Sequence, residues 1–229
     1  MIESIIPEIE ALERRLRYYS IMGIRDVRLS KESKSYIRDP LFNINDLDEL
    51  RQYIEGCRRC ELHKGRKNIV IGEGSSNAQL VFVGEAPGRE EDLEGRPFVG
   101  EAGRLLTKII AAMGLKREDV YICNVIKCRP PRNRDPKRHE MERCVPYLEK
   151  QLEIIAPEVI CTLGRIALIG LFRRDMKITE VRGKWLKWKD IPVMPTYHPA
   201  FLLRNPSSKR EVWEDMKQII RHLGLEGRN

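Results

Sequence analysis

The arrangement of apolar and polar residues divides the chain near residue 79. Before that point, apolar residues recur at helical spacing within residues 5–20, and charged residues separate them. This pattern predicts an amphipathic helix, followed by a polar connector at residues 31–40. A second helical pattern begins after Asp46, a residue type that caps first helical turns well.

From residue 79 onward, short apolar runs alternate with longer amphipathic segments. The predicted strands cover residues 80–84, 120–127, 158–163, 185–188 and 191–196, and the predicted helices cover residues 101–113, 138–155, 165–172 and 208–223. Such alternation is typical of an α/β fold, with a mostly parallel sheet and helices on both faces. We expect the functional side chains in loops at the carboxyl ends of these strands.

The size and composition indicate a globular protein. With 229 residues, the chain suits one domain with an appendage, and 41% hydrophobic and 33% charged residues argue against disordered and fibrous classes. No run of eighteen apolar residues is present, so we expect no membrane partner. The acidic residues near the start are unlike a signal peptide, and the sequence therefore predicts a cytoplasmic protein.

The positive charge is concentrated after residue 50. The formal net charge is +8, but residues 1–50 hold 8 basic and 10 acidic side chains. The remainder, with 34 basic and 24 acidic side chains, therefore carries +10. A basic domain favours an anionic partner such as nucleic acid, although charge alone fits a generic basic protein equally well.

The six cysteines fall into two groups. Without an export signal a disulfide framework is not expected, so metal ligation and burial are the alternatives. Cys123 and Cys161 lie in apolar runs and are expected to be buried. The other four lie in polar, arginine-rich surroundings: Cys57, Cys60, Cys128 and Cys144. Four thiolates fit tetrahedral zinc and a cubane iron–sulfur cluster equally well, and scattered buried thiols are the remaining alternative.

Two residues at strand ends are candidates for acid–base chemistry. Glu85 is the first residue after the strand predicted at 80–84, within a Gly/Pro turn, where a solvated surface turn is the simpler interpretation. His198 follows the strand predicted at 191–196 and precedes a proline that fixes the backbone. This is a suitable place for a catalytic imidazole, although a His that only forms local hydrogen bonds would look the same.

Two further residues suit recognition of a flat ligand. Phe98 stands between Pro and Gly residues in a polar segment, where it can stack on a base or fold back onto the core. Asn124 lies within a predicted strand, and its amide matches the donor–acceptor edge of a pyrimidine. A hydrogen bond from this amide to a neighbouring backbone group is the equal alternative.

Two segments suit contact with DNA. Apolar and basic side chains stand together in a proline-bounded segment, at Leu202, Leu203 and Arg204. They can wedge into a duplex or, alternatively, pack onto the last helix. Residues 127–143 alternate arginine with proline and suit phosphate contact, and the arginines singled out are Arg129, Arg132 and Arg134. A solvated basic face is the alternative there.

Together, and in this order, the motifs resemble the family 4 iron–sulfur uracil-DNA glycosylases. The motifs are Cys57-x-x-Cys60, GEAPGREED (84–92), GRPFVGEAGRLL (95–106), YICNVIKCRPPRNRDP (121–136), Cys144 and HPAFLLRNP (198–206). The likeness begins near residue 50, so we predict a glycosylase domain at residues 51–229 and a helical extension at residues 1–50. Cys123 stands where the family leads us to expect Thr.

The resemblance implies a three-layer α/β/α fold with a four-stranded, mainly parallel sheet. It also implies a [4Fe–4S] cluster held by the four polar-segment cysteines, which favours iron over zinc. The implied activity is a monofunctional hydrolase that flips deoxyuridine out of single- or double-stranded DNA and releases uracil, leaving an abasic site. Loop 132–135 lacks the longer insertion of a sister family that becomes trapped on that site. We expect a monomer, and no clamp-binding motif is visible.

The resemblance also implies a role for each site residue. His198 would donate to uracil O2, and Glu85 would position the attacking water or stabilise the cationic sugar, with Glu91 and Asp92 as helpers. The Ala86 amide would contact uracil, Phe98 would stack on it, and Asn124 would recognise O4 and N3–H. Leu202, Leu203 and Arg204 would fill the gap in the duplex. The rival hypotheses are a non-enzymatic iron–sulfur DNA-binding module, a glycosylase for other damaged bases and a zinc protein.

Overall fold

The computed structural model describes residues 40–225, and from Asn43 onward they form one compact unit. The amphipathic helix predicted at residues 5–20 lies outside the described residues. Helix α3 (Leu47–Glu55) begins as predicted, because the Asp46 carboxylate accepts hydrogen bonds from the backbone N–H groups of Asp48 and Glu49. This helix crosses residue 50, and the domain boundary placed there stays a prediction.

The sheet has six strands in the order β1-β3-β2-β4-β6-β5. Their bounds are β1 (Glu73–Gly74), β2 (Leu80–Gly84), β3 (Tyr121–Asn124), β4 (Val159–Leu163), β5 (Leu186–Trp188) and β6 (Ile191–Thr196). The central four strands pair in parallel, which confirms the predicted mainly parallel sheet. The sheet has six strands and not the predicted four, because the short strands β1 and β5 pair antiparallel with the two outer strands of the central four, β3 and β6. The two-residue strand β1 is too short to leave a periodic signal in the sequence.

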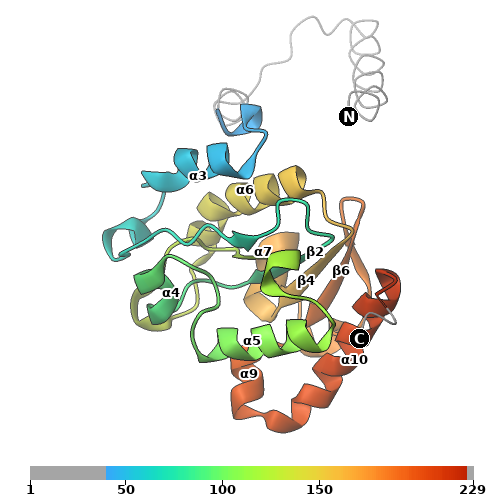
Figure 1. Cartoon of the computed structure of the whole chain (residues 1–229). Helices are drawn as coiled ribbons and strands as arrows, with labels where there is room; N and C mark the ends of the chain where they lie inside the picture. Colours follow the sequence, from blue (N-terminus) through green and yellow to red (C-terminus); the bar gives the residue numbers. More distant parts are fainter. Residues whose placement is uncertain (1–39, 226–229) are drawn as a thin grey trace, which may run out of the picture. The chain divides into compact units, whose positions relative to one another are not determined.

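Helices cover both faces of the sheet. Their bounds are α4 (Arg89–Glu94), α5 (Glu101–Ala112), α6 (Arg138–Ile155), α7 (Arg165–Phe172), α8 (Ile178–Val181), α9 (Pro199–Arg204) and α10 (Lys209–His222). Connections between parallel strands are almost always right-handed, so the direction in which the chain steps across the sheet decides which face the connecting helix covers. From β2 to β3 the chain steps toward the β1 side of the sheet, and from β3 to β4 and on to β6 it steps toward the β5 side. Accordingly, α5, α9 and α10 lie on one side of the sheet and α6 lies on the other (Figure 1).

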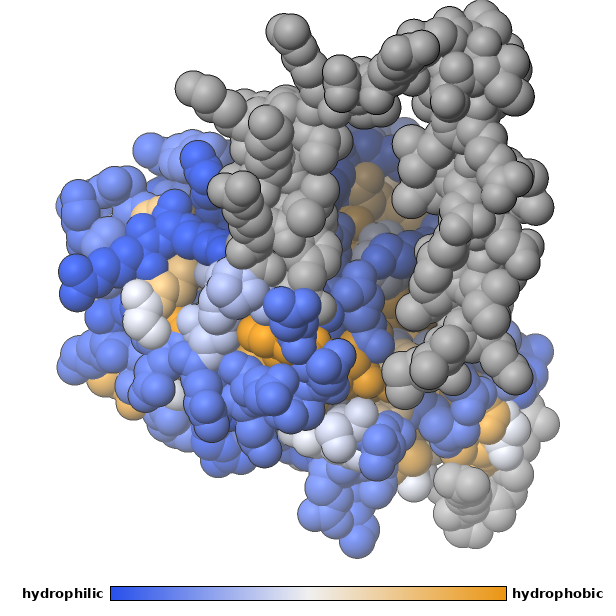
Figure 2. Space-filling model, turned by 90° about the horizontal axis from the view of Figure 1, so that it is seen from above, coloured by the Kyte–Doolittle hydropathy of each residue, from blue (hydrophilic) through white to orange (hydrophobic). Residues whose placement is uncertain are grey.

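The central strands are mostly apolar because both of their faces are covered. Every residue of β2, β3 and β4 is buried. The predicted burial of Cys123 and Cys161 is confirmed, since both are fully buried. Hydrophilic residues cover most of the face seen in Figure 2. No helix within residues 40–225 is long and apolar enough to cross a membrane.

The predicted strand at residues 120–127 is shorter than expected and ends at Asn124. The Val125 N–H donates to the Gly84 carbonyl, and the Ile126 N–H donates to the Glu85 carbonyl. The chain after Asn124 therefore runs against the loop that follows β2, although it no longer belongs to the ladder. This arrangement joins the ends of two neighbouring strands.

Candidate active site

The carboxyl ends of three parallel strands bring the predicted site residues to one edge of the sheet. Glu85 follows β2, Asn124 ends β3, and His198 stands two residues beyond β6. Gly84 and Asn124 are register partners in the β2–β3 pair. The strand order places β2 at the centre of this edge, as expected for a site in an α/β sheet.

Gly84 makes room for two of the predicted side chains. A Cβ atom at this position would lie 2.3 Å from Asn124 Oδ1 and 2.5 Å from Phe98 Cζ. The centroids of the Phe98 and His198 rings are 5.6 Å apart, with 33° between the ring planes. Phe98 is buried, as the packing alternative required, yet its ring lies next to Asn124 Oδ1 and the His198 ring. The structure thus brings Phe98 and Asn124 together at Gly84 and places the His198 ring next to that of Phe98.

Asn124 carries an acceptor without a partner. Its side chain is 1% exposed, and within the described residues only its Oδ1 and Thr162 Oγ1 are buried side-chain atoms that lack a hydrogen bond. An unsatisfied buried acceptor costs stability and is uncommon in folded proteins. The alternative of a hydrogen bond from a neighbouring backbone group therefore does not hold for Oδ1, which is available to a donor from a ligand.

His198 is held as a neutral donor. Burial lowers its pKa to about 4, against a smaller opposing effect of Glu91. Its Nδ1 accepts a hydrogen bond from the Ala200 N–H at 3.1 Å, so the ring proton belongs on Nε2. Gly164, with φ +90°, lets the His198 backbone approach closely, because a Cβ there would lie 2.9 Å from His198 Cβ. The local hydrogen bond and a role toward a ligand are thus compatible.

Glu85 titrates near neutrality. Burial, with a smaller contribution from Asp135, raises its pKa to about 7, while Arg165 acts in the opposite direction. Asp135 and Arg165 pair with each other at 2.8 Å, and both side chains are largely exposed. Ala86 follows Glu85 in the same loop. When ionised, a half-buried carboxylate at this strand end can carry negative charge toward a developing cation.

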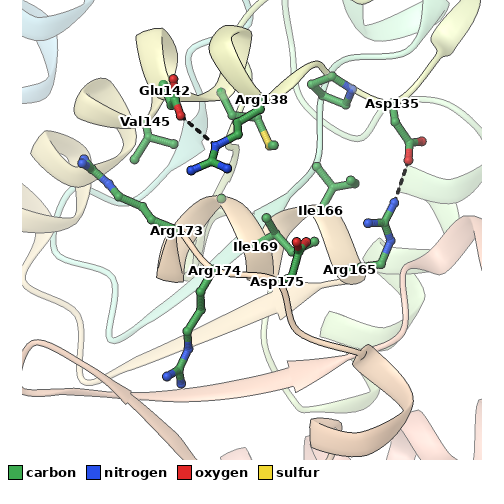
Figure 3. A pocket seen from close by; sticks show the side chains of 13 residues that line it. Asp135, Arg138, Glu142, Val145, Arg165, Ile166, Ile169, Arg173, Arg174 and Asp175 are labelled. Atoms are coloured by element: carbon green, nitrogen blue, oxygen red, sulfur yellow. Dashed lines mark hydrogen bonds and ion pairs between the residues drawn. The ribbon is translucent and has the colours of Figure 1, made fainter.

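A groove of about 690 Å³ opens between α6 and α7. The Asp135–Arg165 pair lies at one end of it, and Ile166 and Ile169 project from α7 between the charged residues (Figure 3). Arg138 pairs with Glu142 along the α6 side. Several of the arginines around the groove are thus already balanced by carboxylates of this chain.

Glu91 ties together the two loops that border the pocket. Its carboxylate accepts hydrogen bonds from the N–H groups of Gly88, Val99 and Gly100, at 2.9–3.0 Å. These three hydrogen bonds hold the loop after β2 against the segment that precedes α5. Asp92 accepts hydrogen bonds from the Lys67 and Asn68 N–H groups and anchors a different segment.

Arg117, which no motif marks in the sequence, holds the backbone at Pro97 and Phe98. Its guanidinium donates to the carbonyl oxygens of Pro97 and Phe98 at 2.8 and 3.2 Å. Phe98 has φ +52°, an uncommon conformation for a residue with a side chain, and these bonds help to maintain it. An isolated Arg in a polar segment has no sequence pattern that would have revealed this role.

The four polar-segment cysteines line one small cavity, which confirms that they are not scattered. Hydrogen-bond donors point at two of their sulfurs: Arg66 Nη1 lies 3.2 Å from Cys128 Sγ, and the Lys127 N–H nitrogen lies 3.3 Å from Cys144 Sγ. Among residues 40–225, no three Cys, His, Asp or Glu side chains are placed so that they could hold a metal ion. Four thiols spread around one cavity, with donors to sulfur, fit a polynuclear cluster.

Comparison with known proteins identifies the family. A profile of the Uracil DNA glycosylase superfamily matches residues 71–217. The type-4 uracil-DNA glycosylase of Archaeoglobus fulgidus is 50% identical, over 77% of this chain and 92% of that protein. The type-4 enzyme of Thermotoga maritima is 45% identical, over 84% of this chain and all of that protein. This chain belongs to the type-4 uracil-DNA glycosylases.

The segment expected to enter DNA is only partly available in this uracil-DNA glycosylase. Leu202 is 1% exposed and packs against Val212 and Met216 of α10, so the wedge role predicted for it is wrong and the packing alternative holds. A helix turns successive side chains by 100°, and α9 therefore cannot present Leu202 together with its neighbours. Leu203 is partly exposed and Arg204 is exposed.

The basic loop of this glycosylase presents its arginines unequally. Arg134 donates both terminal nitrogens to the buried Glu140 carboxylate at 2.8 and 2.6 Å, so its charge is engaged within the fold. Arg129 Nε donates to Asn133 Oδ1 at 2.8 Å, and Arg132 is exposed. Arg132 is the best placed of the three for contact with phosphate.

Proposed function

We propose that this chain removes uracil from DNA by hydrolysing the N-glycosidic bond of a flipped deoxyuridine, as a step of base excision repair. The observation that carries the proposal is the buried Oδ1 of Asn124, to which no protein group donates. This atom lies next to the Phe98 ring across Gly84, and the His198 ring centroid is 5.6 Å from that of Phe98. Membership of the family supports the same activity.

The pocket suits the hydrogen-bonding edge of uracil. N3–H of uracil would donate to Asn124 Oδ1, the Asn124 amide nitrogen would donate to O4, and the Phe98 ring would pack against the base. The Ala86 amide is proposed as a further contact. Cytosine presents an acceptor at N3 and a donor at N4, so it would leave Asn124 unpaired; such a mismatch discriminates strongly.

The two titratable groups suit the charge changes of the reaction. As the bond between N1 and C1′ breaks, negative charge develops on uracil O2 and positive charge on the sugar. The Nε2–H of neutral His198 would donate to O2, which is electrostatic stabilisation of the leaving group. Ionised Glu85 would stabilise the sugar cation and orient the water that adds to C1′. The products are uracil and an abasic site.

Contacts with DNA are assigned to exposed side chains. Flipping a base out of a duplex costs roughly a few kcal/mol, and side chains that fill the gap offset part of this cost. Leu203 and Arg204 are proposed for that role, while Arg129 and Arg132 are proposed to contact phosphates. Single- and double-stranded substrates are both compatible with this arrangement.

Cys57, Cys60, Cys128 and Cys144 are proposed to hold a [4Fe–4S] cluster. The cavity that they share and the donors to two of their sulfurs support the assignment. When bound, the cluster would order the DNA-facing loop after β3 without taking part in bond cleavage. The residues that act on the base and sugar all lie outside this ligand set.

The direct test is alkali-sensitive cleavage of a labelled oligonucleotide that contains one deoxyuridine, with a thymidine oligonucleotide as control. Strand breakage only at deoxyuridine, and only after alkali, supports a monofunctional uracil-DNA glycosylase. Breakage without alkali would contradict monofunctional action. A protein that binds this DNA without releasing base would instead support the DNA-binding module. Competition by an oligonucleotide that contains hypoxanthine tests for a wider range of bases.

A further inference from the structure

Lys127 is a fully buried cation between the cysteine site and the proposed uracil pocket. Its side chain is 1% exposed, and it lies three residues after Asn124 and directly before Cys128. We propose that Lys127 is a positioning residue that couples the cysteine site to the orientation of Asn124, and thereby to discrimination between uracil and cytosine. This inference rests on the proposed function.

The contacts of Lys127 reach both sites. Its backbone N–H donates to Cys144 Sγ at 3.3 Å. Its Nζ donates to the backbone carbonyl oxygen of Asn124 at 2.6 Å and to Gln151 Oε1 at 2.5 Å. One residue therefore contacts a proposed cluster ligand with its backbone and the proposed base-recognition residue with its side chain.

Gln151 fixes the ammonium group from helix α6. The Gln151 amide nitrogen donates to the Ile71 carbonyl oxygen and to Tyr121 Oη, each at 2.9 Å. With its own two contacts occupied, the Gln151 side chain cannot turn away from Lys127. Buried polar networks of this kind hold one conformation when every member is satisfied.

The Lys127 ammonium also interacts electrostatically with Cys128 and Cys144, so its charge acts on the cysteine site as well as on Asn124. Burying a cation is costly, and an apolar side chain of similar length would fill the same space without that cost. What the ammonium adds is a bond to the carbonyl at the end of β3. The next two residues, Val125 and Ile126, donate their N–H groups to the Gly84 and Glu85 carbonyls. The bond from Lys127 Nζ to the Asn124 carbonyl therefore adds a further restraint on the segment from Asn124 to Lys127.

Fixing the Asn124 backbone sets where its side chain can reach. No protein group donates a hydrogen bond to Oδ1 of Asn124. Its position depends on the backbone and on packing against Gly84 and Phe98. Loss of the Lys127 contact should therefore weaken recognition of uracil more than it alters the rest of the site.

The experiment measures binding of two oligonucleotides to the intact, iron-loaded protein. One contains a non-cleavable deoxyuridine analogue and the other contains deoxycytidine at the same position. The variants are Lys127→Met, which keeps length and removes the donor, and Lys116→Met, a control at an exposed lysine. Iron content, visible absorbance and the unfolding midpoint are measured for each protein.

We expect Lys127→Met to keep its iron and visible absorbance but to lower the uracil-to-cytosine affinity ratio by about tenfold or more, since a misplaced buried partner costs about 1.4 kcal/mol or more. Lys116→Met should match the unchanged protein. An unchanged ratio in Lys127→Met would overturn the inference. Loss of iron in that variant would overturn it too, because Lys127 would then serve the cysteine site alone.

A second variant keeps the test decisive if Lys127→Met does not fold. Gln151→Met removes one of the two acceptors of the ammonium group and should lower the ratio in the same direction, with iron retained. A normal ratio in folded Gln151→Met would overturn the inference. If the unchanged protein itself does not distinguish the two oligonucleotides, it is the proposed function that fails.

Discussion

At the scale of single residues, burial sets the charge states of the site. Desolvation disfavours whichever form is charged, so it lowers the pKa of His198 to about 4 and raises that of Glu85 to about 7. His198 is thus a neutral donor at every pH above about 5, while Glu85 changes charge close to neutrality. Desolvation thus keeps His198 neutral, so that it can donate a hydrogen bond, and it leaves Glu85 able to ionise near neutral pH.

The rate of uracil release should follow the ionisation of Glu85. If the carboxylate is the active form, kcat/KM rises with pH through about 7 and reaches a plateau above it. His198 adds no inflection in this range, because its pKa lies near 4. The measurement is a pH–rate profile of the unchanged protein and of Glu85→Gln, in which the rise should disappear. The same rise in Glu85→Gln would assign it to another group.

Asn124→Asp and His198→Ala should each lower uracil release by a factor of about 100 or more. Asp would present oxygens to both N3–H and O4 of uracil, and Ala would remove the donor to O2. The matched control is Asn77→Asp at an exposed loop position, which should keep the full rate. Single-turnover rates and unfolding midpoints are the measurements. Near-normal rates in both folded variants would refute the pocket assignment.

At the scale of one element, helix α9 places the neighbouring residues Leu202 and Leu203 in different environments. Leu202 lies in the core cluster that also contains Val212 and Met216, whereas Leu203 is partly exposed. The helical turn between consecutive residues decides this separation. The pair therefore offers a comparison in which one substitution tests packing and the other tests contact with DNA.

Leu202→Ala should lower the free energy of unfolding by about 2–5 kcal/mol, the usual cost of truncating a buried leucine. Leu203→Ala should change it by less than about 1 kcal/mol, since a partly exposed side chain leaves little cavity. Leu203→Ala should slow the release of uracil from double-stranded DNA more than from single-stranded DNA, because only in a duplex does the flipped base leave a gap for Leu203 to fill. Equal slowing on both substrates would argue against insertion of Leu203.

At the scale of the whole molecule, the cysteine site joins distant parts of the chain. Cys57 and Cys60 follow α3, Cys128 lies in the loop after β3, and Cys144 lies in α6. These segments meet at one cavity next to the basic loop. A cluster at that cavity would connect the start of the described unit to the edge of the sheet where the site lies.

Cys128→Ser should remove most of the visible absorbance and iron and lower the unfolding midpoint. Serine is a poor ligand for iron–sulfur clusters, and loss of one bridge between distant segments frees the others. Cys161→Ser, at a fully buried cysteine away from the cavity, is the control and should keep its iron. An unchanged visible spectrum in Cys128→Ser would remove this residue from the ligand set.

The sequence by itself determined the elements and the candidate chemistry. Apolar runs and capping residues placed the central strands and the helix from Arg138 to Ile155, because periodicity is a local property. The order of the motifs was enough to identify the family that the comparisons confirm. The grouping of the four cysteines also followed from their polar surroundings.

Only the tertiary structure decided which of these residues are free to act. The burial of Leu202, the engagement of Arg134 by Glu140, and the supports that Glu91 and Arg117 provide all depend on contacts between segments. The unpaired Oδ1 of Asn124 and the shifted pKa values depend on how completely water is excluded at the strand ends. Solvent exclusion is set by packing between distant parts of the chain, and a local pattern of residues does not encode it.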